Sequence, residues 1–385
     1  MSRTLTPSDR GAVLQQNRAG RGERFLRALR TPGGAVFVLL VALLAAIIAV
    51  NPSFGEPDSF IRFIGRTAPI AIAAIGQYFV IVSGEFDLSM GSVVTMQVIT
   101  AGNLIGDDDA KVIPVLLLMF VLGAFIGLVN GLVTTLLRVP SFIVTLGMML
   151  ALLGLVLFWT GGAAQGNPAD SFRQIGRGGI EGVPVLEVIP YPVIILAAVA
   201  ALAFWLMRRP YGRTLIAAGD NPTAAALTGA PVWWIKTRAF MLSSLAATVA
   251  GILLVGYAGV HPSVGRGYEF TAITAVVLGG VVLGGGRGWV LSAAAGAFAL
   301  ESLFTLLNFV GVQSTWRDSV QGAIIIVAVA AAAKTWQRKR KGTAAPAHEA
   351  PPQQVEPPQP AQTATAAPDS TAIEQSEHHN GTTAR

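Results

Sequence analysis

Side chains that could do chemistry are few in this sequence, and they lie far apart. The chain has no cysteine, which excludes disulfides, thiolate metal sites and cysteine nucleophiles. It also lacks the G-x-x-x-x-G-K-[ST] phosphate loop, the H-E-x-x-H zinc motif and the G-x-S-x-G nucleophile motif. His261 is the one histidine in the apolar region, and His348, His378 and His379 lie near the C-terminus, where we expect them to be solvated. These residues indicate a protein that is not an enzyme and binds no metal or cofactor of its own.

The dominant pattern is a series of apolar runs between residues 34 and 333, with short polar breaks. About 20 apolar residues in a helix cross the ~30 Å hydrocarbon core of a bilayer. The runs are continuous and do not alternate, which favours helices over barrel strands. We therefore predict an all-α, polytopic membrane protein with about ten transmembrane helices. The predicted spans are 34–50, 67–83, 89–106, 112–137, 141–160, 188–207, 239–258, 270–284, 289–310 and 318–333.

Lysine and arginine predict the orientation, because cytoplasmic loops retain them. With ten spans and the N-terminus inside, most of the 27 basic residues fall in cytoplasmic segments. We predict three parts: a basic cytoplasmic segment 1–33, a membrane domain 34–333 with a cytoplasmic loop at 208–238, and a cytoplasmic tail 334–385. The tail is rich in Pro, Ala, Gln and Thr, so it is expected to be mostly disordered. The net charge of +6 follows from this topology and does not indicate nucleic-acid binding.

Polar residues interrupt the apolar pattern first at residues 77–92, QYFVIVSGEFDLSMGS. Ser83-Gly84 is expected to end one helix and Asp87 to cap the next, because a carboxylate accepts hydrogen bonds from the free N–H groups of a first turn. Two arrangements fit. One is a tight turn between helices. The other is an interrupted membrane element lining a cavity, since polar backbone at membrane depth is tolerated only there.

Two polar residues inside the predicted spans are candidates for a functional role. Asn130 lies in the fourth span, where it either makes a hydrogen bond between helices or contacts a ligand. Glu301 is about midway along the ninth span, where a charged carboxylate must be paired, protonated or exposed to water. Ionisable residues are otherwise very rare in the spans. This scarcity argues against a proton-coupled carrier, because such residues mark ion and proton paths.

The loop 208–238 is the longest predicted cytoplasmic loop between spans. Asn221-Pro222 should begin a short helix over 223–228, and Gly229 should end it, because glycine tolerates positive φ. Small alanines give this helix a smooth face that could enter a groove on a partner. The alternative is an ordinary surface helix.

The chain resembles the membrane permeases of ribose/xylose-type ABC sugar importers, within the branched-chain and sugar permease superfamily. Four segments between about residues 60 and 333 carry the resemblance. They are G-x-x-DLS-x-GS at 84–92, NG … P-x-FI-x-TLG at 130–147, YG-R … A-x-G-x-N-x₂-AA-x₃-G at 211–229, and GYE-x₃-I-x-AVV-x-GG … GGRG at 267–288. Glu85-Phe86 and Glu301 depart from the residues usual in this family, which leaves the choice of substrate open.

The resemblance implies a subunit of the bacterial plasma (inner) membrane. It pairs with a second permease chain, usually identical, with ABC ATPase domains that bind ATP and Mg²⁺, and with an extracytoplasmic sugar-binding protein. The loop helix then corresponds to the coupling helix that docks on the ATPase, through Asp220, Asn221, Ala224, Ala225 and Gly229. Residues expected to line the translocation path are Glu85, Asp87, Ser89, Asn130, Phe142, Thr145 and Glu301.

The function expected from this resemblance is ATP-driven uptake of a monosaccharide, such as ribose or xylose, or of a polyol. A related permease for branched-chain amino acids or nucleosides has the same architecture. Two other classes are an ion-coupled secondary carrier and a membrane enzyme acting on lipid-linked sugars. The enzyme would need a cluster of carboxylates at one membrane face, and the sequence has none there.

Overall fold

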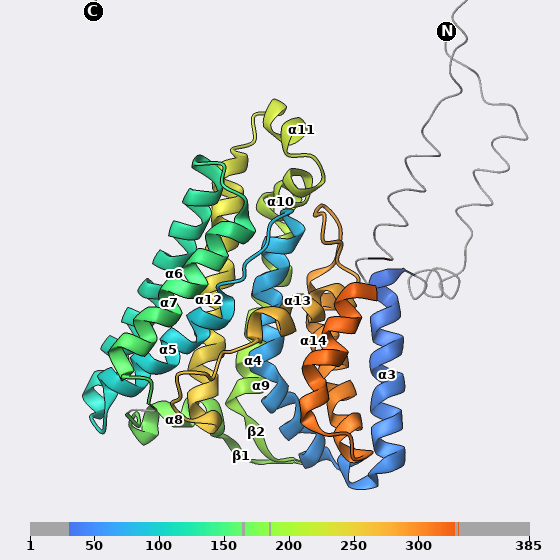
Figure 1. Cartoon of the computed structure of the whole chain (residues 1–385). Helices are drawn as coiled ribbons and strands as arrows, with labels where there is room; N and C mark the ends of the chain where they lie inside the picture. The colour runs from blue at the N-terminus through green and yellow to red at the C-terminus, as the bar shows by residue number, and fades with distance from the viewer. Residues whose placement is uncertain (1–30, 164–165, 185, 328–329, 331–385) are drawn as a thin grey trace, which may run out of the picture. The chain divides into compact units, whose positions relative to one another are not determined.

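The computed structural model describes residues 31–163, 166–184, 186–327 and 330. The predictions for residues 1–30 and for the tail 334–385 lie outside the described residues. In the described part nearly every regular element is a helix (Figure 1). The exception is a short antiparallel hairpin of β1 (Gly179–Val183) and β2 (Leu186–Pro190), in which Ile180 pairs with Ile189.

Seven helices in the described part are long and apolar enough to cross a membrane. Each coincides with one of the predicted spans. They are α3 (Pro32–Val50), α4 (Pro57–Val82), α6 (Val112–Leu136), α7 (Ser141–Thr160), α9 (Tyr191–Arg208), α12 (Val232–Ala258) and α14 (Val290–Phe309). The polytopic membrane class is confirmed.

Two other predicted spans are shorter in the structure. The span expected at 89–106 is α5 (Met90–Ile105), with 16 residues. The span expected at 270–284 is wrong, because α13 (Tyr268–Leu278) has only 11 residues. It ends before Gly279 and Gly280, and Gly280 has a positive φ of 77° that ends the helix. The last predicted span is helical over the described residues 317–327.

Two helices begin earlier than the hydropathy of the sequence suggested. α4 begins ten residues before its predicted span, and its early turns contain Asp58, Arg62 and Arg66. α12 begins at Val232, and its early turns contain Lys236 and Arg238. Charged residues in these turns end an apolar run, but they do not prevent helix formation, so hydropathy alone set both boundaries too late.

α12 lies at the centre of the bundle and packs against α4, α5, α6 and α8 (Asp170–Arg177). Its closest neighbour is α6, which presents glycine at every fourth position: Gly123, Gly127 and Gly131. A Cβ added at Gly127 would lie 2.6 Å from the Cα of Met241 on α12. Small residues allow two membrane helices to approach this closely, and dispersion contacts then hold them together.

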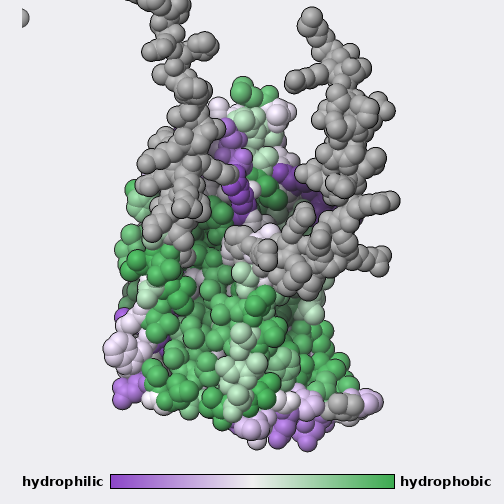
Figure 2. All heavy atoms as spheres, turned by 90° about the vertical axis from the view of Figure 1, so that its right-hand side faces the viewer, coloured by the Kyte–Doolittle hydropathy of each residue, from purple (hydrophilic) through white to green (hydrophobic). Residues whose placement is uncertain are grey.

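The outer surface of the bundle is apolar where it would meet lipid or another chain. Figure 2 shows hydrophobic residues over the middle of one side, with hydrophilic residues gathered at the lower edge. α7 adds large exposed side chains, including Leu150 at 58% and Phe158 at 88% exposure. α4 and α12 are mostly buried, whereas α3, α7 and α9 are mostly exposed. This distribution places the core of the bundle around α4 and α12.

Candidate functional site

The segment between α4 and α5 is a buried break in the helical structure. α4 ends at Val82, α5 begins at Met90, and residues 85–89 have no regular structure. Figure 1 shows this segment descending from the end of α4, beside α10 (Pro210–Asp220), to the start of α5. With 16 residues α5 is about 24 Å long, too short to cross the hydrocarbon core. The structure therefore has an extended break between the helices and not a tight turn, whereas a cavity lined by this break stays a prediction.

Asp87 lies in this break and joins it to a neighbouring helix. Its side chain has no solvent exposure. One carboxylate oxygen accepts hydrogen bonds from the amide (3.0 Å) and the hydroxyl (2.6 Å) of Ser89. The other accepts from the Ser243 hydroxyl of α12 at 2.7 Å. A buried carboxylate needs such donors, because its desolvation is otherwise very costly.

The expectation that Asp87 caps the second helix is wrong. Ser89 holds the cap position of α5 and makes no capping hydrogen bond with its side chain. The helix begins only at Met90 because the Asp87 carboxylate bonds to Ser89 and Ser243 and not to the first turn. Asn130 of α6 donates to the Ser89 hydroxyl at 2.9 Å, so it links α6 to the break. The expected hydrogen bond between helices is therefore present, and a contact of Asn130 with a ligand stays a prediction.

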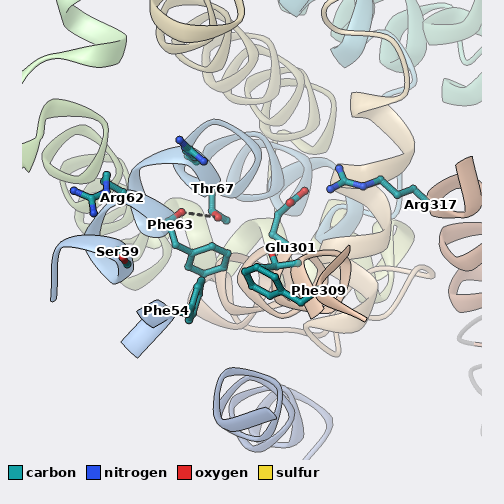
Figure 3. A pocket seen from close by; sticks show the side chains of 10 residues that line it. Phe54, Ser59, Arg62, Phe63, Thr67, Glu301, Phe309 and Arg317 are labelled. Atoms are coloured by element: carbon teal, nitrogen blue, oxygen red, sulfur yellow. Dashed lines mark hydrogen bonds between the residues drawn. The ribbon is translucent and has the colours of Figure 1, made fainter. Parts of the chain in front are cut away.

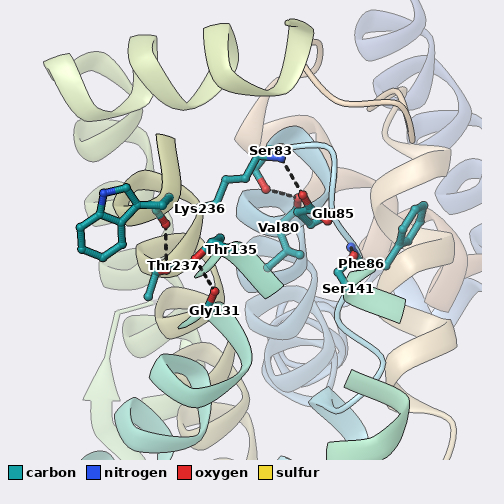
Figure 4. A network of polar contacts seen from close by, with 10 residues as sticks. Val80, Ser83, Glu85, Phe86, Gly131, Thr135, Ser141, Lys236 and Thr237 are labelled. Atoms are coloured by element: carbon teal, nitrogen blue, oxygen red, sulfur yellow. Dashed lines mark hydrogen bonds and ion pairs between the residues drawn. The ribbon is translucent and has the colours of Figure 1, made fainter. Parts of the chain in front are cut away.

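A second set of contacts holds the other side of the break (Figure 4). Glu85 and Lys236 of α12 form an ion pair of 2.6 Å, with side-chain exposures of 18% and 13%. The amide of Phe86 donates to the Ser141 hydroxyl of α7 at 3.1 Å. Thr145, also on α7, is buried and donates to the carbonyl of Ser141. Phe142 does not join this network, since it is 52% exposed on the outside of α7.

The start of α13 lies beside the start of α5. The amide of Gly265 donates to the Thr95 hydroxyl of α5 at 3.1 Å. Glu269, in the first turn of α13, is 7% exposed and packs against Gly91, where an added Cβ would lie 2.0 Å from its carboxylate. Two short helices therefore begin next to each other inside the bundle, the arrangement in which interrupted membrane helices build polar sites.

Three backbone segments meet at one end of the bundle in a glycine junction, formed by Gly84, Gly219, Gly285 and Gly286. The amide of Gly286 donates to the carbonyl of Val82 at 2.8 Å. A Cβ at Gly219 would lie 1.9 Å from the same carbonyl, so only glycine allows α10 to approach α4 this closely. At this junction the last turn of α10 therefore contacts both the α4–α5 break and the loop after α13.

The short loop helix has the predicted caps. α11 (Pro222–Leu227) begins after Asn221, whose side chain accepts from the amide of Ala224 at 2.9 Å, and Gly229 follows it with a φ of 82°. Asp220, Asn221 and Ala224 are exposed, but Ala225 is 6% exposed and faces the protein. Leu227 is 85% exposed at the end of the helix.

Tyr211 connects α10 to the start of α12. Burial raises the pKa of the Tyr211 phenol, so the phenol stays neutral and donates a hydrogen bond to the carbonyl of Ile235 at 3.4 Å.

Glu301 does not belong to the network around the break. It lies on α14 and points into a cavity together with Thr67 and Arg317 (Figure 3). Among the residues that the structure describes, no group of three or more His, Asp or Glu side chains could hold a metal ion. The candidate residues thus fall into two places: the break with its partners, and the Glu301 cavity.

Some residues of these sites were not selected from the sequence. Lys236, Ser243 and Ser141 hold the break, and Glu269 lies between the two short helices. Glu269 occurs in the fourth motif and Lys236 follows the third motif, but neither had an assigned role. A lysine or glutamate within an otherwise apolar helix was the available signal.

The comparison with known protein families decides the class of the protein. Residues 59–329 match the family described as the permease component of branched-chain amino acid transport systems. The chain belongs to this permease family. The family resemblance inferred from the four sequence motifs is thereby confirmed.

Related proteins cover most of this permease. It is 33% identical over 303 residues to the ribose import permease protein of Haemophilus influenzae, covering 77% of this chain and 91% of that protein. It is 34% identical over 298 residues to the ribose import permease protein of Escherichia coli K12, covering 76% of this chain and 91% of that protein. It is also 30% identical over 293 residues to an autoinducer 2 import system permease protein of Klebsiella pneumoniae. This match covers 76% of this chain and 83% of that protein. No solved structure gives a significant match.

The permease is accordingly a transport subunit of an ABC importer and not an enzyme. It is a multi-span protein of the bacterial inner membrane. ABC permeases of this kind work with an ATPase and a substrate-binding protein, so both partners follow from the family. This membership separates the permease from ion-coupled carriers and from enzymes of lipid-linked sugars.

Proposed function

We propose that this permease forms the path for ATP-driven uptake of a monosaccharide, ribose- or xylose-like, or of a polyol, delivered by an extracytoplasmic binding protein. The observation that carries the proposal is its similarity to ribose import permeases over about nine-tenths of their length. The family description points to branched-chain amino acids as the second candidate substrate class. Nucleosides are the remaining alternative from the sequence.

The assembly we propose has two copies of the permease around one path, with ATP and Mg²⁺ bound by the partner ATPase. Each copy has about ten membrane segments with both termini in the cytoplasm. Seven are the long helices, α5 and α13 enter the membrane without crossing its full thickness, and the helix at 317–327 belongs to the tenth. The exposed apolar face of α7 supports contact with lipid or a second copy, since exposed patches of this kind are rare in isolated soluble proteins.

Within this assembly α11 is the coupling helix. Its exposed residues Asp220, Asn221, Ala224 and Leu227 would meet the ATPase, and Leu227 supplies an apolar anchor of the kind that dominates small interfaces. Gly229 ends the helix, and Ala225 supports it from within the permease. The glycine junction would pass its movement to the α4–α5 break.

The path residues we propose that hold or flank the break are Glu85, Asp87, Ser89, Asn130 and Thr145. Phe142, which follows Ser141 on the exposed side of α7, is also proposed from the family resemblance. The ion pair of Glu85 with Lys236 supports a cytoplasmic gate, because it joins the break to the helix that follows the coupling loop. Movement of α11 would then open or close the path by shifting α12 against the break.

Uptake by the reconstituted system tests the substrate class. The permease, its ATPase and its binding protein are placed in liposomes with labelled D-ribose, D-xylose or L-leucine. We expect accumulation of a sugar that depends on ATP and persists when proton and sodium gradients are abolished. Accumulation of leucine alone would favour the amino-acid alternative, and uptake driven by an ion gradient without ATP would contradict the ABC assignment.

Replacing Leu227 with aspartate tests the coupling helix. The variant is expected to fold, because the side chain is 85% exposed, but to lose association with the ATPase and most ATP-driven uptake. Leu227→Met keeps an apolar anchor and is the matched control. Normal uptake by Leu227→Asp would remove α11 from the coupling surface.

A further inference from the structure

The cavity beside Glu301 lies at the end of the bundle away from the coupling loop. Two adjoining hollows of about 1120 and 390 Å³ share Arg66, Glu301 and Arg317 in their walls, and we call them together the outer cavity. Its walls include the early turns of α4, the start of α13 and the second half of α14. The other end of α4 contacts Gly219 beside the coupling loop, so the cavity lies toward the opposite end of the bundle, which is the extracytoplasmic end in the proposed topology.

Two of the shared charged side chains, Glu301 of α14 and Arg317 of the helix at 317–327, lack close partners. Among the described residues, the Glu301 carboxylate takes part in no ion pair within 4.0 Å and no hydrogen bond, although it feels the charge of Arg317. The Nε of Arg317 is buried without a hydrogen-bond partner, and its guanidinium lies 4.9 Å from the ring centre of Phe304. Both face the same cavity (Figure 3). A charged side chain midway along a membrane helix is expensive unless a polar group or water meets it.

Charge and chemistry in the larger hollow indicate which solute would fit. The charges of this hollow balance, since Arg66, Arg266 and Arg317 line it together with Glu269, Glu301 and Asp318, and the smaller hollow adds only Arg62. This near balance favours a neutral solute over a strongly charged anion or cation. Aromatic surfaces come from four side chains, which are Tyr257, Tyr268, Phe270 and Phe304. The wall therefore combines aromatic and apolar surface with many hydrogen-bond donors and acceptors, to which Ser263, Thr271 and Gln321 also contribute, and such groups complement the hydroxyls of a solute.

We propose that the outer cavity is a substrate-binding site of the permease itself, and that it takes a neutral polyhydroxylated solute. Glu301 accepts hydrogen bonds from the solute's hydroxyl groups and Arg317 donates to its oxygens, while aromatic rings pack against its carbon face. The inference rests on the proposed uptake of a sugar or polyol. It adds a binding step between the delivery of the solute and its passage through the break.

Protection of a single cysteine tests this site without requiring transport. The chain has no cysteine, so Thr305→Cys in the cavity wall provides a unique thiol. The full-length permease in lipid nanodiscs is treated with a small, membrane-impermeant methanethiosulfonate. We expect the thiol to react, and D-ribose, D-xylose or mannitol to slow the reaction several-fold, whereas L-leucine leaves the rate unchanged. Ala110→Cys, on an exposed turn outside the cavity, is the control, and no solute should protect it.

Changes at Glu301 then connect protection to the site. In the Thr305→Cys background, Glu301→Ala should abolish protection by the sugar while the thiol stays reactive. Glu301→Gln keeps an acceptor oxygen, so this variant should retain part of the protection by the sugar. An unreactive thiol, a reactive thiol that no sugar or polyol protects, or rapid disulfide dimerisation that shows a second copy filling the cavity would each overturn the inference.

These outcomes are separable from failure of the proposed function. If the reconstituted importer accumulates ribose but ribose gives no protection, the binding site is wrong and the function stands. If leucine alone is imported and alone protects, both the solute class and the proposed function are wrong.

Discussion

Asp87 and Glu85 are two carboxylates two residues apart, and the structure stabilises them in different ways. Asp87 is fully buried and is satisfied by hydroxyl and amide donors from Ser89 and Ser243. Glu85 is partly exposed and pairs with Lys236. Hydrogen bonds to an ionised group are stronger than neutral ones, and an unpaired charge in a dry interior is costly. Each contact therefore holds the break at a defined place on α12.

Removing the charge of Lys236 should destabilise the permease. Lys236→Met leaves Glu85 without its partner at 18% side-chain exposure, and we expect a loss of about 3 kcal/mol, seen as a lower midpoint in thermal unfolding of the purified chain. The double variant Glu85→Gln with Lys236→Met should recover much of the loss. Lys111→Met, which breaks an exposed pair with Asp108, is the control and should change the midpoint little. An equal effect of both lysine changes would contradict the structural role of the pair.

Glu301 should not couple protons to transport. A proton path across the membrane normally requires several titratable groups in series, and Glu301 is the one ionisable residue of α14, so no second group continues such a path along this helix. Glu301→Gln should therefore keep ATP-dependent uptake with at most a modest change in affinity. Loss of uptake in this variant, together with acidification of the liposome lumen by the unaltered permease, would require a different transport class.

At the scale of the elements, interrupted helices and close glycine contacts determine how the bundle could move. α5 and α13 are too short to cross the membrane, and they begin beside each other inside the bundle. Their loops meet α10 at the glycine junction, where backbone packs directly on backbone. Packed backbones transmit displacement well, because no flexible side chain lies between them.

Gly219→Ala tests the junction. The added methyl group would overlap the carbonyl of Val82, so α10 must move away from α4, and we expect about 1–3 kcal/mol of destabilisation. ATP hydrolysis should also become less dependent on substrate delivery. Gly154→Ala on α7, where an added Cβ meets nothing within 4 Å, is the matched control and should leave both properties unchanged. Unaltered coupling in Gly219→Ala would show that the junction transmits no movement.

At the scale of the whole molecule, the polar contacts lie inside and the large apolar side chains of α7 and α9 lie outside. The inner contacts include the Asp87 and Glu85 networks, which tie α7 and α12 to the break. This distribution is the one a bilayer requires, because lipid offers no hydrogen bonds to backbone or side chain. The segments at the two ends of the chain, outside the described residues, are predicted from composition alone.

Removing residues 343–385 should leave transport intact. The composition of this segment predicts a solvated chain that makes no essential contact with the membrane domain. ATP-driven uptake and copurification of the ATPase should both match those of the full-length chain. If the truncated protein failed to assemble with its ATPase, the tail would be a docking element.

Local patterns were enough to predict much of this protein. Continuous apolar runs located seven membrane helices, since burial in lipid depends on the length and polarity of one segment. Asn221 and Gly229 located the loop helix, because caps act within one turn. The four motifs, read in order, identified the permease family.

Only the tertiary structure decided how distant residues meet. The sequence did not show that Asp87 bonds to Ser243, that Glu85 pairs with Lys236, or that the eighth predicted span is a short helix. The first two pairs are separated by more than 150 positions, and their partners depend on how α12 packs against the break. Hydropathy and capping act on neighbours along the chain, whereas these contacts arise from close packing between helices, which no local pattern encodes.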